Sequence, residues 1–102
     1  MSVNLVVLYP QPTDIAAFES DYEGHLALWH EKAGIPKDQT PYTILRFAPG
    51  PDGPAPYYQM VTMPFPSAEA LEEAMSTPLM EELGADAVRI STGGPPLILV
   101  GA

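Results

Sequence analysis

The chain of 102 residues contains no cysteine, which excludes disulfide bonds, thiolate nucleophiles and sulfur-ligated zinc or iron–sulfur centres. Basic residues are scarce: four lysines and arginines stand against 13 aspartates and glutamates, and the formal net charge is −9. This charge repels phosphate backbones and anionic lipid headgroups. We therefore expect neither a nucleic acid nor a membrane surface as a partner.

Long apolar runs are missing as well. None approaches the roughly 20 residues of a membrane span. The first apolar segment, residues 3–9, lacks the basic flank and the cleavage site of a signal peptide. The length and composition predict one cytoplasmic domain that covers residues 1–102.

The sequence also lacks the motifs of common cofactor and catalytic sites. Its only histidines, His25 and His30, are five residues apart, so on a helix they diverge instead of sharing one face as metal ligands would. The glycines form no phosphate-binding or dinucleotide-binding pattern, and no serine lies in a Gly-x-Ser-x-Gly elbow. We expect no metal and no cofactor, and any chemistry must come from other side chains.

Hydrophobic periodicity and turn residues predict four strands and two helical regions. The expected elements are a strand at 3–9, a helix from 14 to 30 or 32, strands at 42–47 and 57–63, a helix from 67 that breaks at Pro78 and continues over 79–87, and a strand at 97–100. A loop rich in proline and glycine, residues 48–56, joins the two central strands. This order is the ferredoxin-like βαββαβ pattern of an α+β fold, in which helices cover one face of an antiparallel sheet.

The first strand indicates that both faces of this sheet are buried. Leu5 and Val7 point to one face, whereas Val6 and Leu8 point to the other, so apolar side chains do not alternate with polar ones. Because helices can cover only one face, we expect the second face to pack on the sheet of another copy of the chain. The sequence thus predicts a homodimer packed sheet to sheet.

His25 is the strongest chemical candidate, because helical spacing places it on the apolar face of the first helix. That face consists of Phe18, Tyr22, Leu26 and Trp29. One interpretation is a core histidine whose ring nitrogens are satisfied by neighbours. The other is a pocket in which His25 acts as proton donor, base or ligand anchor and Tyr22 orients it or the ligand. His30 is expected to be exposed at the end of the helix.

Polar and aromatic side chains from the strands are placed to converge with His25 and Tyr22 between the helix and the sheet. The candidate ligand-binding residues are Phe18, Trp29, Tyr42, Arg46 and Tyr58, and Thr62 is a further neighbour. Tyrosines in strands often serve only in packing. Arg46 is either an ion-pair partner for the acidic helix or an anchor for an anionic ligand group.

Four segments, in order and spacing, carry a family resemblance. They are the opening Val-Val-Leu-Tyr-Pro-Gln-Pro-Thr-Asp, the helix with Phe18, Tyr22 and His25-Leu26, the loop Gly-Pro-Asp-Gly-Pro-Ala-Pro-Tyr-Tyr, and the closing Thr-Gly-Gly. Together they resemble the EthD family, named for a protein encoded with an oxygenase system that degrades ethyl tert-butyl ether. The resemblance implies a dimeric α+β barrel of two ferredoxin-like subunits, and relatives that include cofactor-independent enzymes. The family's helix histidine maps onto His25, which is followed here by Leu-Ala-Leu instead of Leu-Pro-Leu.

Three functions stay open at this point. The first is a cofactor-independent enzyme acting on a small apolar or aromatic compound, with His25 moving a proton. The second is a non-catalytic binding or auxiliary protein of an oxygenase system. The third is a filled barrel in which His25 is a satisfied core residue. A place in catabolic or oxidative pathways, such as xenobiotic degradation, follows from the resemblance alone, because this architecture hosts many activities.

Overall fold

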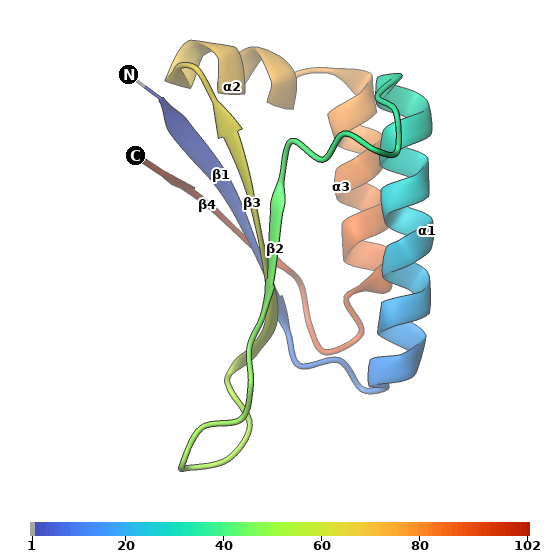
Figure 1. The fold of residues 1–102 in the computed structure, drawn as a ribbon, viewed down its shortest axis with the longest axis vertical. Coiled ribbons are helices and arrows are strands. Elements are labelled where there is room, and N and C mark those ends of the chain that lie inside the picture. The colour runs from blue at the N-terminus through green and yellow to red at the C-terminus, as the bar shows by residue number, and fades with distance from the viewer. Residues whose placement is uncertain (1) are drawn as a thin grey trace.

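The computed structural model describes residues 2–102 and has the predicted ferredoxin-like arrangement (Figure 1). Its elements are β1 (Val3–Pro10), α1 (Ile15–Ala33), β2 (Thr43–Arg46), β3 (Tyr57–Phe65), α2 (Ala68–Met75), α3 (Pro78–Ile90) and β4 (Leu97–Gly101). All strand pairs are antiparallel, and the sheet order is β2-β3-β1-β4. The βαββαβ prediction is therefore confirmed, with the second helical region divided into α2 and α3.

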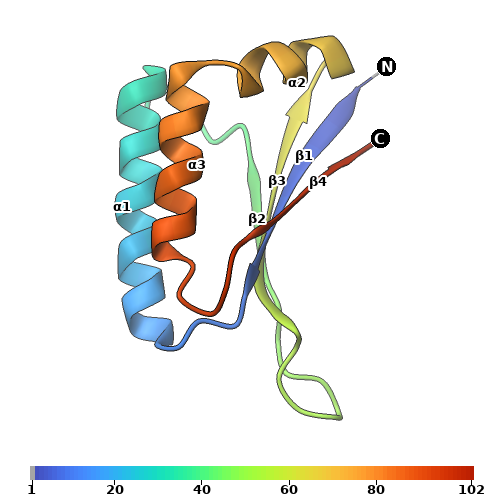
Figure 2. The ribbon, with the colours of Figure 1, turned by 180° about the vertical axis from the view of Figure 1, so that it is seen from behind.

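The helices lie on one side of the sheet. Figure 1 and Figure 2 show α1 and α3 side by side over one face, with α2 across the end where the chain termini lie. The opposite face has no helix over it in either view. The side chains of each strand therefore divide into a set that faces the helices and a set that faces away.

Local capping sets the helix boundaries. Asp14 and Ser67 cap α1 and α2 by accepting hydrogen bonds from backbone amides three residues later. α1 ends at Gly34, whose φ of 70° is the left-handed conformation that glycine adopts without a steric penalty. Thr77 caps α3, and Pro78 occupies the first turn, where a missing N–H costs nothing. Pro78 thus begins a new helix as well as ending the previous one.

The core lies between the helices and the sheet. It is built around Tyr9, Phe18, Tyr22, Val61, Ala87 and Ile90. The ring of Tyr9 packs edge-to-face on Phe18 and Tyr22, with centroid separations of 5.3 and 5.7 Å. Such contacts add to the hydrophobic gain of burial, so they hold α1 firmly against β1.

His30 is buried, and the prediction that it is exposed is wrong. Its side chain lies under the segment that follows α1, and the residue is only 7% exposed. Nδ1 donates to the Ile35 carbonyl at 3.0 Å, and Nε2 accepts from the Tyr42 hydroxyl at 2.9 Å. The chain reverses at Gly34 and brings both partners over the last turn of the helix. The helical periodicity of α1 cannot predict that the chain folds back over its last turn.

A close backbone approach at Gly93 generates a prediction about stability. A Cβ atom at this position would lie 1.8 Å from the carbonyl oxygen of Gln11, so Gly93→Ala forces the two segments apart. We expect this substitution to lower the free energy of unfolding by more than about 1 kcal/mol. The measurement is thermal denaturation followed by circular dichroism.

Gly24→Ala is the matched control, because Gly24 lies within α1 and a Cβ there meets nothing within 4 Å. This substitution should leave the melting temperature unchanged or raise it, with a gain of about 0.4–1 kcal/mol from reduced flexibility of the unfolded chain. Equal effects of the two substitutions would contradict the close approach at Gly93.

Candidate functional site

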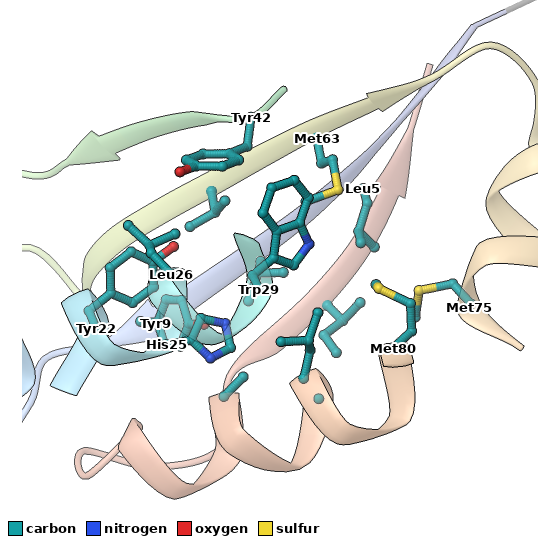
Figure 3. Close-up of a pocket in the computed structure, with 16 residues that line it drawn as sticks. Leu5, Tyr9, Tyr22, His25, Leu26, Trp29, Tyr42, Met63, Met75 and Met80 are labelled. Carbon is teal, nitrogen blue, oxygen red and sulfur yellow. The ribbon is translucent and has the colours of Figure 1, made fainter. Parts of the chain in front are cut away.

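A pocket of about 100 Å³ lies between the sheet, α1 and α3. Its lining is mainly apolar and aromatic (Figure 3). The labelled residues are Leu5, Tyr9, Tyr22, His25, Leu26, Trp29, Tyr42, Met63, Met75 and Met80. A concave apolar site with few polar groups is the usual form of a small-molecule pocket.

The two ends of the pocket differ in chemistry. Figure 3 shows His25, Tyr9 and Tyr22 gathered at one end. Three methionines, Met63, Met75 and Met80, lie toward the other end, with Trp29 between the two groups. Thioether side chains are flexible and polarisable, so the methionine end can adapt its shape to an apolar group. The arrangement suits a compound with one polar end and one apolar end.

A carboxylate fixes the orientation of the His25 ring. Nδ1 of His25 lies 2.8 Å from Oδ2 of Asp86, and the two side chains are only 12% and 16% exposed. Arg89 donates through Nε to the other oxygen of Asp86, also at 2.8 Å. Because the ionised carboxylate can only accept, Nδ1 carries the hydrogen, and Nε2 of the neutral ring is left as the basic nitrogen.

Asp86 stays ionised in this setting. Burial on its own raises the pKa of the Asp86 carboxyl, but the hydrogen bonds from Arg89 and His25, together with their charges, outweigh burial and hold that pKa below its usual value. A negative charge therefore stands beside His25 at neutral pH.

Two of these residues were not among the sequence candidates. Asp86 follows the buried Leu83 by three residues and precedes the buried Ile90 by four, a spacing that places a carboxylate next to the apolar face of its helix. Tyr9 follows Leu5 and Val7 at intervals of two in β1, which places it on the same face of the sheet. Both spacings can be found in the sequence, but neither shows which side chain lies opposite across the pocket.

A comparison with protein families finds that the EthD domain model matches residues 10–93. The chain belongs to the EthD family. The solved structure of an EthD family protein from Bacillus halodurans C-125 is 29% identical to it, covers 100% of this chain and 98% of that one, and superposes with a TM-score of 0.81.

Two further structures share the fold at lower identity. A dimeric ferredoxin-like protein of unknown function from Jannaschia sp. CCS1 is 15% identical, with coverage of 100% and 99% and a TM-score of 0.71. SnoaB, a cofactor-independent oxygenase from Streptomyces nogalater, is 18% identical, with coverage of 99% and 91% and a TM-score of 0.61. A comparison with curated proteins finds no match.

The EthD pocket brings together some of the residues expected from the sequence and leaves others outside. His25, Tyr22, Trp29 and Tyr42 line it. Phe18, Arg46, Tyr58 and Thr62 are not part of the lining that the described residues form. Phe18 lies in the core instead, where it is 1% exposed and stacks on Tyr22 at a centroid distance of 5.8 Å.

Arg46 and Tyr58 are joined to Glu19 of α1. The Arg46 guanidinium makes two parallel hydrogen bonds to the Glu19 carboxylate, at 2.8 and 2.7 Å, and the Tyr58 hydroxyl donates to the same carboxylate. Of the two roles expected for Arg46, the structure shows the ion pair with the acidic helix. The cluster ties α1 of the EthD domain to β2 and β3.

No helix in the described part of the EthD chain, residues 2–102, is long and apolar enough to cross a membrane. No group of three or more histidine, aspartate or glutamate side chains in it is arranged to hold a metal ion.

The Glu19 cluster predicts an acid-sensitive contribution to stability. Burial raises the pKa of the Glu19 carboxyl, but hydrogen bonds from Tyr58 and Arg46 and the Arg46 charge bring it below its ordinary value. The stabilisation is therefore present above the unfolded pKa of about 4.3 and is lost as the pH falls through the lower folded pKa. Glu19→Gln should cost about 1 kcal/mol or less at pH 7, because the pair is partly exposed.

Thermal melts of both proteins from pH 7 down to about pH 3 test this linkage. The difference between wild type and Glu19→Gln should shrink as the pH falls. Glu23→Gln serves as the control, since Glu23 is an exposed residue one turn further along α1. A difference for Glu19→Gln that is independent of pH would refute the linkage.

Proposed function

We propose that this EthD protein binds a small apolar or aromatic compound in its pocket and acts on it by proton transfer at His25, without a bound cofactor. The observation that carries the proposal is the bond from His25 Nδ1 to Asp86 at the wall of an apolar pocket. A carboxylate that holds one ring nitrogen of a histidine selects the tautomer whose other nitrogen can act as a base. Nε2 is then the atom that exchanges a proton with the ligand.

The surroundings of His25 favour this chemistry over simple packing. A protonated imidazole in an apolar pocket is costly unless an opposite charge is close. Asp86 supplies that charge, and Arg89 holds the second carboxylate oxygen so that the pair stays in place. The dyad can therefore accept a proton from a ligand and return it within one turnover.

The fold likeness to SnoaB, described as a cofactor-independent oxygenase, is compatible with chemistry performed by side chains alone. At 18% identity this is an argument from fold and does not name a reaction. The association with catabolic or oxidative pathways, and the cytoplasmic location, stay predictions from the sequence.

The second candidate is a non-catalytic binding or auxiliary protein of an oxygenase system. The aromatic and methionine walls of the pocket favour it, because they can hold an apolar compound without reacting with it. Because the interior holds a pocket, both candidates are favoured over a filled barrel in which His25 is only a core residue. Binding without turnover distinguishes the auxiliary protein from the enzyme.

Trp29 provides the first assay, because it is the only tryptophan and lines the pocket. Its fluorescence should change saturably on titration with at least one class among small phenols, quinones, lactones and ethers. Each compound that binds is then assayed for turnover.

His25→Ala should bind that compound within about threefold of wild type and lose turnover by about 10² or more, the usual share of a general acid or base. Asp86→Asn should lower turnover less than His25→Ala does, because Nε2 remains while its charge partner is lost. Turnover that survives in His25→Ala would refute the catalytic role. Binding with no turnover in wild type would establish the auxiliary protein instead.

We further propose that the chain is a homodimer through the face of the sheet that has no helix over it. In β1, Val6 and Leu8 alternate with Leu5 and Val7 of the helix-facing side. Their neighbours across the sheet continue the apolar surface, and the whole open face includes Val6, Leu8, Leu45, Met60, Leu97 and Leu99. A contiguous apolar patch of this kind marks an interface.

Two observations support a second copy of the chain as the partner. Leu45, Leu97 and Leu99 are 48%, 42% and 45% exposed in the isolated chain. The fold relative from Jannaschia sp. CCS1 is described as a dimeric ferredoxin-like protein. Two such faces packed together would give the dimeric α+β barrel.

Leu99→Lys tests the interface, since it places a charge among the apolar side chains of the open face, next to Val6 of β1. We expect sedimentation velocity to show a dimer for wild type and a shift toward monomer for this variant, with unchanged far-ultraviolet circular dichroism. Val88→Lys is the control, because Val88 is 57% exposed on α3, away from the open face. A Leu99→Lys protein that remains as dimeric as Val88→Lys would rule out this interface.

A further inference from the structure

We infer that the hydroxyl groups of Tyr9 and Tyr22 form a clamp for an oxygen atom of the ligand, so that the pocket selects small, neutral ring compounds with a hydroxyl, carbonyl or ether oxygen at the His25 end. The inference rests on the proposed function and deepens it by naming the ligand class. It also adds Tyr9, a residue of β1, to the site.

The two tyrosines belong to one end of the pocket. Tyr9 and Tyr22 both line it, and they are 2% and 3% exposed. Their rings meet edge-to-face with centroids 5.7 Å apart, and the Tyr22 ring lies 5.6 Å from the His25 ring. Figure 3 shows all three side chains gathered there. A ligand that reaches His25 from the pocket therefore passes close to both phenol rings.

The hydroxyls of this pair are not used by the protein, in contrast to those of other tyrosines. Tyr42 is bonded to His30 and Tyr58 to Glu19. Among residues 2–102, neither Tyr9 nor Tyr22 has a hydrogen-bond partner for its hydroxyl, although both are almost completely buried. The fully buried side-chain atoms that lack a partner in this part of the chain are those of Gln59. The phenolic hydroxyls of Tyr9 and Tyr22 are therefore not sealed in the core but border the pocket, where an occupant can supply the acceptor.

The charges around the clamp favour a neutral oxygen. Burial raises the pKa of both phenols, and the nearby Asp86 charge raises that of Tyr9 further, so both stay protonated donors at neutral pH. A carboxylate ligand would stand close to Asp86 in a site with little water. Arg89 also pairs with Asp86, but its side chain is 60% exposed and water screens its charge, so it does not fully offset this repulsion. A hydroxyl, carbonyl or ether oxygen accepts the same hydrogen bonds without this repulsion.

The dimensions of the pocket limit the ligand to about one ring. Its volume is about 100 Å³. An apolar cavity of roughly 150 Å³ is known to accommodate benzene. The remaining walls near the clamp, Leu26 and Trp29, are apolar and suit a ring body. The pocket is smaller than that cavity, so one six-membered ring is the upper limit of its size, and a single oxygen substituent on the ring would meet the clamp.

Three probes of one shape test the inference: p-cresol, p-xylene and p-toluate share a para-substituted benzene ring and differ in one group. We expect isothermal titration calorimetry at pH 7.5 to show that p-cresol binds about tenfold tighter than p-xylene, which is the value of about one net hydrogen bond. p-Toluate should bind more weakly than p-cresol by a similar factor, because it is ionised.

Tyr9→Phe and Tyr22→Phe should each lower the preference for p-cresol over p-xylene severalfold, while the affinity for p-xylene stays within about threefold. Tyr42→Phe is the matched control. Tyr42 lines the same pocket, but its hydroxyl is bonded to His30, so its removal should leave the preference unchanged. Circular dichroism establishes that each variant is folded.

Equal binding of p-cresol and p-xylene to wild type would overturn the clamp, whether or not the variants fold, and would leave the proposed pocket intact. A p-cresol preference that persists in both Tyr9→Phe and Tyr22→Phe would do the same. Tighter binding of p-toluate than of p-cresol would overturn the selection for neutral ligands. Binding of none of the three probes would overturn both the clamp and the proposed binding function. Selective binding in a protein that turns over no ligand would support the clamp and refute the proposed catalysis.

Discussion

The packing of Tyr9 in β1 against Phe18 and Tyr22 in α1 is the contact on which the rest of the molecule depends. These rings hold the long helix on the sheet, and two of them also form the wall of the pocket. The helix is therefore fixed by the same side chains that line the pocket and form the proposed clamp. Since the core supports these residues on several sides, the site has little freedom to relax, which is a condition for orienting a small molecule.

The position of the His25 ring depends on residues of two helices. Its ring neighbours Tyr22 on α1 and is held by Asp86 on α3, so the imidazole bridges the two helices that cover the sheet. A shift of α3 relative to α1 would break the pair and free the ring. The ion pair thus contributes to the packing of the helices as well as to the chemistry proposed for the pocket. A substitution at Asp86 is therefore expected to change both the stability of the protein and the proposed activity.

Local patterns predicted most of the fold because they act over a few residues. The helix that starts near Asp14, the helix that starts near Ser67 with a break at Pro78, and the two faces of β1 all follow from patterns within one segment, and the structure has each of them. Prediction failed at His30, whose burial depends on the chain returning over α1 after Gly34. The two roles left open for Arg46 were likewise decided by Glu19, which lies 27 residues away.

The sequence by itself determined the order of strands and helices, the lack of thiol chemistry, and the position of His25 on an apolar helix face, because these follow from composition and from spacing within a segment. It also carried the features that place the chain in the EthD family. Only the tertiary structure decided which groups stand around His25. Asp86 lies 61 residues further along the chain, and Tyr9 comes from a different element. Which of many carboxylates and tyrosines reaches the histidine depends on how α1, α3 and the sheet pack together, and no local spacing encodes that packing.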